Sequence, residues 1–119
     1  MSYDIRLKEP VTKETILFKQ KHHVTGGMYC IGGTQEAWLN VTWNYAPIFR
    51  RVIHYKKGIR AIYGMTGAES IPILKSAIDS LKNDETNNYF DPTEGNARKA
   101  LCGLLAFAQM RPDGIWDGD

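Results

Sequence analysis

The sequence has few cysteines, little net charge and no long apolar run, and each shortage excludes a class of protein. Cys30 and Cys102 lie far apart in apolar surroundings, which favours two buried thiols in a reducing compartment over a disulfide. No stretch approaches the roughly 20 apolar residues of a membrane-spanning helix, and the charged residues 1–10 do not resemble a signal peptide. We therefore expect a cytoplasmic protein without contact to a membrane.

Motifs for nucleotide hydrolysis and for metal binding are also missing. The glycine-bearing loops at residues 26–34 and 63–70 match neither GxxxxGK[ST] nor GxGxxG. His22, His23 and Cys30 lack the spacing of a zinc site. No cofactor and no metal site are expected.

The composition is that of an ordinary folded domain. Hydrophobic residues make up 43% of the 119 residues and charged residues 24%, which is typical of a soluble globular chain with one core. We predict a single domain over residues 1–119. It would have a strand-rich part at 1–45, a helix-rich part at 46–110 and an acidic C-terminal tail at 111–119 that frays while Trp116 docks.

Alternating apolar and polar residues predict the strands. Residues 3–8 alternate cleanly, EPVTK reads as a turn, and residues 14–18 return as a second strand, so an N-terminal hairpin is expected. A short apolar run precedes a third alternating segment at residues 36–45, which is also predicted to be a strand.

Proline, glycine and capping residues predict the helices. One helix should begin near Pro47 and end at Gly58. The following segment IRAIYG could be a strand or a continuation of this helix. For the next helix, Ser70 is preferred to Thr66 as the N-cap, because a start at Thr66 would place Pro72 inside the helix. The last helix should start at Asp91, with a proline at its first position.

Together these elements predict an α+β fold. An antiparallel sheet of about four strands would pack on two to three helices as a two-layer sandwich.

Charge is distributed unevenly despite a net value of +2. Residues 50–60 contain five basic side chains and no acid, whereas the last third of the chain is acidic. Such a surface could attract an acidic partner, pair with a second copy or simply be solvated. Nucleic-acid binding is not favoured, because most aromatic residues near this stretch are at core-facing positions by their period.

One face of the segment at residues 36–45 suggests a binding site. Trp38 could stack on a ligand, and Asn40, Thr42 and Asn44 could form hydrogen bonds to it. Asparagine is disfavoured in strands, so its repetition on one face calls for an explanation. A solvent-exposed sheet face is the alternative. The remaining candidates for an anionic group are Arg50, Arg51, Thr66 and Gly67, the last two at a helix start.

Several segments together resemble a known group of proteins. They are SYDIRLKEPVT, GGTQEAWLNVTWNY, YGMTGAESIP, PTEGNARKAL and MRPDGIWDGD. Over nearly its whole length the chain resembles small uncharacterised proteins carried by phages, prophages and gut bacteria. The resemblance implies no catalytic residues, but it implies an accessory or anti-defence role.

These observations favour a non-enzymatic binding protein that sequesters a phosphorylated or nucleotide-like small molecule. The alternative is a protein–protein inhibitor or a homo-oligomeric interaction module, in which the same face and Trp116 form an interface. A small hydrolase, with Glu36 or Glu69 as base and His54 as acid, is the third hypothesis.

Overall fold

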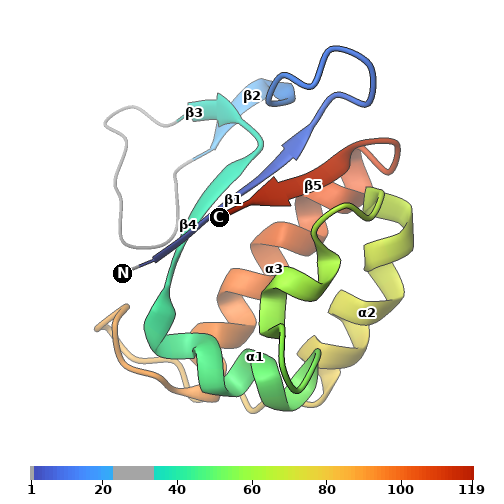
Figure 1. Ribbon diagram of the computed structural model, residues 1–119. Helices are drawn as coiled ribbons and strands as arrows, with labels where there is room; N and C mark the ends of the chain where they lie inside the picture. The colour runs from blue at the N-terminus through green and yellow to red at the C-terminus, as the bar shows by residue number, and fades with distance from the viewer. Residues whose placement is uncertain (1, 23–33) are drawn as a thin grey trace.

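The computed structural model describes residues 2–22 and 34–119 and confirms the predicted α+β class (Figure 1). The described residues form three α-helices, two 3₁₀ helices and five strands in two antiparallel sheets. In chain order the elements are β1 (Ser2–Lys8), β2 (Leu17–His22), β3 (Thr34–Glu36), β4 (Trp38–Thr42), η1 (Trp43–Tyr45), α1 (Ala46–Val52), η2 (Gly58–Ile62), α2 (Gly67–Asp79), α3 (Glu94–Met110) and β5 (Ile115–Gly118).

The central sheet has the strand order β4-β1-β5, and both neighbours run antiparallel to β1. The strand predicted over residues 3–8 is confirmed, and its apolar residues Tyr3, Ile5 and Leu7 are buried. The interleaved charged residues are exposed or half-buried, so only one face of β1 lies wholly in the core. Figure 1 shows the three α-helices gathered on one side of this sheet, which is the two-layer arrangement expected.

The predicted N-terminal hairpin is formed only by the residue pairs next to its turn. Thr15 forms an isolated antiparallel bridge with Lys8, and the Ile16 amide donates to the Leu7 carbonyl at 3.0 Å. The chain then leaves β1, and β2 pairs with β3 in a separate two-stranded sheet. Ile16 is fully buried and anchors the chain at this corner, so the second strand begins later than predicted.

The strand predicted over residues 36–45 is interrupted and shorter. β3 and β4 are separated at Ala37, and β4 ends at Thr42. The Thr42 hydroxyl accepts a hydrogen bond from the Asn44 amide at 3.2 Å. This local bond caps η1 and turns the chain out of the sheet.

The helix predicted to begin near Pro47 is present as α1, but it ends at Val52 rather than at Gly58. Gly58 lies in the following turn with a φ of 56°, in the left-handed region that favours glycine. η2 starts there, so the ambiguous IRAIYG segment belongs largely to a 3₁₀ helix.

The N-cap of α2 is Thr66, four residues before the predicted cap Ser70, because Thr66 and Glu69 form a complete capping box. The Glu69 amide donates to the Thr66 hydroxyl at 3.1 Å, and the Thr66 amide donates to the Glu69 carboxylate at 3.0 Å. Pro72 consequently lies inside the helix, where it is exposed. Ser70, the predicted cap, is fully buried instead.

α3 likewise starts later than predicted. Thr93 is its N-cap and accepts a hydrogen bond from the Asn96 amide at 3.1 Å. The carboxylate of Asp91, the predicted cap, accepts hydrogen bonds from side chains of the preceding loop. The helix therefore begins beyond the proline that follows Asp91.

The acidic end of the chain forms β5 along β1 instead of fraying. Arg6 donates to the Asp117 carboxylate at 3.0 Å, and the Asp4 amide donates to the Asp119 carboxylate at 2.8 Å. Trp116 docks as predicted and is 1% exposed. The end of the chain is held in place because side chains alternate along the strand. Trp116 points into the core, and the side chains of Asp117 and Asp119 point the other way and accept hydrogen bonds from β1.

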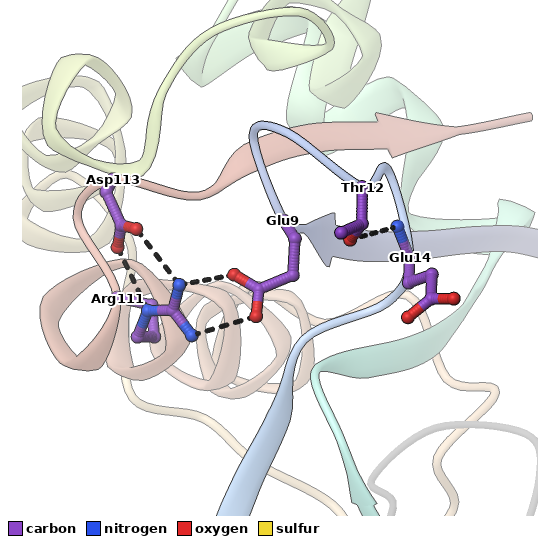
Figure 2. Close-up of polar contacts among 5 residues, drawn as sticks. All are labelled: Glu9, Thr12, Glu14, Arg111 and Asp113. Atoms are coloured by element: carbon purple, nitrogen blue, oxygen red, sulfur yellow. Dashed lines mark hydrogen bonds and ion pairs between the residues drawn. The ribbon is translucent and has the colours of Figure 1, made fainter.

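Arg111 ties the end of α3 to the loop after β1. Figure 2 shows its guanidinium between two carboxylates, those of Glu9 and Asp113. Nη2 lies 2.5 Å from Glu9 Oε1 and 2.9 Å from Asp113 Oδ2. This arrangement joins the first turn of the chain to the turn that leads into β5.

The indole N–H of Trp116 is paired with the hydroxyl of Ser70. Trp116 Nε1 donates to Ser70 Oγ at 2.7 Å, and this hydroxyl donates to the Gly67 carbonyl at 2.8 Å. Ser70→Ala should lower the free energy of unfolding by about 1–3 kcal/mol, because a buried donor loses its partner. Urea unfolding would measure this, with Ser76→Ala on the exposed side of α2 as control. Equal stability of the two variants would contradict the assignment.

The ion pair between Arg6 and Asp117 should make stability depend on pH. The hydrogen bond from Arg6 holds the pKa of Asp117 below its ordinary value of 3.8. The stabilisation is therefore complete above the unfolded-state pKa and is lost as pH falls through the lower folded-state pKa. Asp117→Asn should cost at most about 1 kcal/mol near neutral pH, because both partners are 39% exposed.

This cost should shrink below about pH 4. Urea unfolding at neutral and acidic pH would measure it, with exposed Asp79→Asn as control. A cost that grows on acidification would contradict the ion-pair explanation.

Candidate functional site

The polar face of β4 is largely buried. Asn40 is 5% exposed and Thr42 is 4% exposed. The side-chain amide of Asn40 donates to Ser2 Oγ at 2.9 Å and to the Asp4 carboxylate at 2.8 Å. These bonds join β4 to β1 and explain why an asparagine lies in this strand.

A loop that precedes α3 covers the end of the same strand. The Thr42 amide donates to the Tyr89 hydroxyl at 2.5 Å, and that hydroxyl donates to the Asn40 carbonyl at 3.3 Å. Asn44 is exposed, and its side chain donates to the Phe90 carbonyl at 2.9 Å. The face predicted to bind a ligand thus holds the chain's own loop.

Tyr45 contacts the loop that covers the end of β4. Its hydroxyl donates to the Tyr89 carbonyl. Burial raises the pKa of Tyr45 well above its ordinary value, so the hydroxyl keeps its proton and remains a donor. The aromatic rings of Tyr45 and Tyr89 also meet edge to face, with centroids 5.6 Å apart.

The helix start proposed as an anion site has its backbone donors occupied. The Gly67 amide donates to the Gly114 carbonyl at 2.8 Å, and the Ala68 amide donates to the Pro112 carbonyl at 2.9 Å. The amides of Thr66 and Glu69 are used in the capping box. A Cβ on Gly67 would lie 2.9 Å from the Arg111 carbonyl, so this glycine serves close packing.

The remaining predicted residues do not complete a site. Trp38 is half-buried and packs against the core, Arg50 is exposed, and Arg51 pairs with Glu94 at 3.1 Å. Thr66 forms a bridge to β5, whereas Trp38 lies on β4 at the opposite edge of the central sheet. The structure therefore does not bring the eight predicted residues to one place.

Two of the three groups predicted for acid–base chemistry, Glu69 and His54, form local hydrogen bonds with the backbone. Hydrogen bonds from the Thr66 backbone and side chain lower the pKa of Glu69. Nδ1 of His54 accepts from the amides of Lys56 and Lys57 at 3.2 and 3.0 Å. Glu36 is exposed on β3.

The cysteines do not form a metal site or a disulfide in the part of the chain that the structure describes. Cys102 forms no disulfide within the described residues and is half-buried, whereas Cys30 and His23 lie outside those residues. In residues 2–22 and 34–119, no group of three or more His, Cys, Asp or Glu side chains could hold a metal ion. Within the same ranges, no helix is long and apolar enough to cross a membrane.

The structure contains a groove that sequence reasoning missed, between β2 and the last turns of α3. Its volume is about 630 Å³, within the range of small-molecule sites. We call it the β2–α3 groove. It is lined by Phe18, Lys19, Gln20, Lys21, His22, Leu39, Gly103, Ala106, Phe107 and Met110.

Aromatic contacts hold the two walls of the groove together. The Phe18 and Phe107 ring centroids are 5.4 Å apart, and those of His22 and Phe107 are 5.1 Å apart. His22 Nε2 lies 2.6 Å from the Glu36 carbonyl. Since a carbonyl only accepts, Nε2 carries the proton and the ring is held in one orientation.

One signal in the sequence could have revealed the groove. LFKQKH places Phe18 and His22 on the same side of a strand, since they are separated by an even number of residues. Residues 19–22 lie beyond the strand predicted at residues 14–18, so the prediction does not place His22 on a strand. Its partner wall, the end of α3, became visible only once the helix was placed against the strand.

Asn40→Ala should destabilise the fold by about 1–3 kcal/mol, because the Asp4 carboxylate and the Ser2 hydroxyl lose a buried partner. Chemical unfolding would measure this cost. Asn87→Ala is the control, since Asn87 is exposed in the loop before α3. An unfolding free energy that is the same for both variants would show that the buried amide is not structural.

Comparison of the chain with protein-family models, with curated proteins and with solved structures finds no significant match. The functional argument therefore rests on the chain's own geometry.

Proposed function

We propose that the protein binds, without turnover, a small organic anion with an apolar body in the β2–α3 groove. The observation that carries this proposal is a groove of about 630 Å³ with an apolar interior and lysines along one wall. Small-molecule sites commonly combine an apolar lining with a few polar groups that orient the ligand.

The apolar part of the ligand would lie against Phe18, Leu39, Phe107 and Met110. Phe107 and Leu39 are buried, whereas Met110 is 55% exposed at the end of α3. A ligand that covers Met110 would remove apolar surface from water, which favours binding. The aromatic contacts between the walls support a largely preformed site.

The charged part of the ligand would meet Lys19 and Lys21. Both side chains are exposed, and neither has an ion-pair partner among the described residues. Lys19 and Lys21 alternate with Phe18 and His22 along β2, so their ammonium groups would meet an anionic group of the ligand, such as a carboxylate, phosphate or sulfonate, at the rim of the groove. The anionic character predicted from the sequence is thus retained in the proposal, with a different set of binding residues.

The chemistry of the lining supports binding rather than catalysis. The described residues that line the groove include no carboxylate, hydroxyl or thiol. Besides the two lysines, which the proposal assigns to the anionic part of the ligand, the described lining offers only the imidazole of His22 for acid–base chemistry. Sequestration of a small molecule is one of the accessory roles, beside inhibition, that the predicted resemblance to phage-borne proteins would imply, and we propose this groove as its location.

Ala106→Trp should block the groove. Ala106 is exposed on α3 and lines the groove, so an indole there would occupy ligand space without entering the core. Binding of anilinonaphthalene sulfonate, which joins an aromatic body to an anion, should weaken at least about tenfold, equivalent to a loss of about 1.4 kcal/mol. Isothermal titration calorimetry would measure the affinity.

Gln109→Trp is the matched control, because Gln109 is exposed on the same helix but does not line the groove. Lys19→Glu combined with Lys21→Glu should weaken the sulfonate and leave uncharged N-phenylnaphthylamine unchanged. Unaltered sulfonate binding by Ala106→Trp would refute the groove as the site. Equal affinity for the charged and uncharged probes would refute the role of the lysines.

A further inference from the structure

A second surface, distinct from the groove, gathers basic side chains on α1, η2 and the turn between them. We call it the α1–η2 basic surface. All of its five cationic residues are exposed, and no acidic residue occurs in the stretch that supplies them. They are Arg50, Arg51, Lys56, Lys57 and Arg60. Figure 1 shows α1 and β2 at opposite ends of the molecule.

The turn between α1 and η2 brings the two elements that carry these cations side by side. The Gly58 amide donates to the His54 carbonyl at 2.9 Å, and the positive φ of Gly58 reverses the chain. A Cβ on Gly58 would lie 3.4 Å from that of Phe49 and 3.5 Å from Cγ of Arg50, so η2 returns close to α1. Buried Ile59 anchors the return. Lys56 and Lys57 are thus in the turn, and Arg60 lies beyond it.

Arg60 of this surface lies over an aromatic pair. Tyr3 and Trp43 are stacked with centroids 5.4 Å apart, and the Arg60 guanidinium carbon lies 5.3 and 5.2 Å from their centroids. Arg60 Nε donates to the Asp119 carbonyl at 2.9 Å, and within residues 2–22 and 34–119 its two terminal nitrogens form no hydrogen bond. A guanidinium held in this way on aromatic rings is oriented for a phosphate.

Tyr55 adds an exposed aromatic ring among the cations. Its exposed fraction is 74%, and its ring stacks on that of His54 with centroids 5.0 Å apart and an angle of 19°. Lys56 Nζ lies 5.7 Å from the ring centroid. The sequence placed most aromatic residues of this region in the core, and Tyr45 and Phe49 are indeed buried. Tyr55 differs, so the surface offers stacking as well as charge.

We infer that the α1–η2 basic surface binds single-stranded nucleic acid. Arg51 is partly neutralised by Glu94, whereas Arg50, Lys56 and Lys57 have no ion-pair partner in the described part of the chain. These three residues and Arg60 would contact phosphates, and a base would stack on Tyr55. An acidic protein would satisfy the cations, but it would not require a planar ring at position 55. The exposed, stacked tyrosine therefore favours nucleic acid.

Fluorescence anisotropy with a labelled oligothymidylate of about 20 nucleotides tests this inference on the full chain. About four phosphate contacts at a slope of about −0.7 each predict that affinity falls about 50-fold between about 50 and about 200 mM salt. Tyr55→Ala should weaken binding at least about fivefold, and Tyr55→Trp should retain it. Lys56→Glu combined with Lys57→Glu should make the salt dependence about half as steep.

Lys75→Glu combined with Lys99→Glu is the matched control, because both lysines are exposed on other helices and the change in net charge is the same. Two results would overturn the inference. One is equal binding of oligothymidylate by this control and by the Lys56, Lys57 variant. The other is a glutamate polymer of the same charge that binds as tightly as the oligothymidylate, together with a Tyr55→Ala variant that binds both normally. That result would assign the surface to an acidic protein. The groove variant Ala106→Trp should bind the oligonucleotide normally.

Discussion

Trp116 lies between the central sheet and α2, and its indole joins parts of the chain that are far apart in sequence. Its backbone pairs with β1, its amide donates to the Met65 carbonyl at 2.9 Å, and its carbonyl accepts from Gly64 at 2.9 Å. Its side chain is buried, and the Ser70 hydroxyl satisfies the indole N–H. Because an unpaired buried donor is costly, this bond adds to the backbone contacts that hold α2 against β5. It also makes Trp116 unavailable to a protein interface.

The same requirement to pair buried polar groups explains the face of β4 that first suggested a ligand site. Asn40 and Thr42 carry the hydrogen-bonding groups that a site would need, but partners within the chain occupy them. Such groups raise the specificity of packing, since another register of β4 on β1 would leave them buried and unsatisfied. A polar residue in a strand is therefore a weak indication of ligand binding until its burial and partners are known.

Unlike the buried polar face of β4, the two surfaces proposed for binding expose side chains to solvent. In the β2–α3 groove, Met110 is exposed next to buried aromatic and aliphatic side chains, and the nearby lysines are exposed without ion-pair partners in the described part of the chain. On the α1–η2 basic surface, an aromatic ring and several cations face solvent where packing does not require them. Both surfaces are basic and at opposite ends of the molecule, so a small anion and a nucleic acid could be bound at the same time. An anionic ligand was predicted from the sequence and is also proposed for both of these surfaces.

The sequence by itself determined the fold class, β1, the existence of the three helices and the docking of Trp116. These features follow from local periodicity and from residues such as Pro47, whose preferences do not depend on distant contacts. The capping residues of α2 were ambiguous in the sequence because two local patterns competed there, and contacts with the 112–114 turn favour the earlier start.

Only the tertiary structure decided that residues 115–118 form a strand, that Asn40 is buried and that β2 faces α3. Each of these depends on partners far away in the sequence: β1 for the last strand, Tyr89 for the cover of β4, and Phe107 for the groove. Periodicity identifies which side of an element is apolar, but it does not identify the element that will cover it. The candidate sites are formed by such distant pairings, which is why the groove was not predicted.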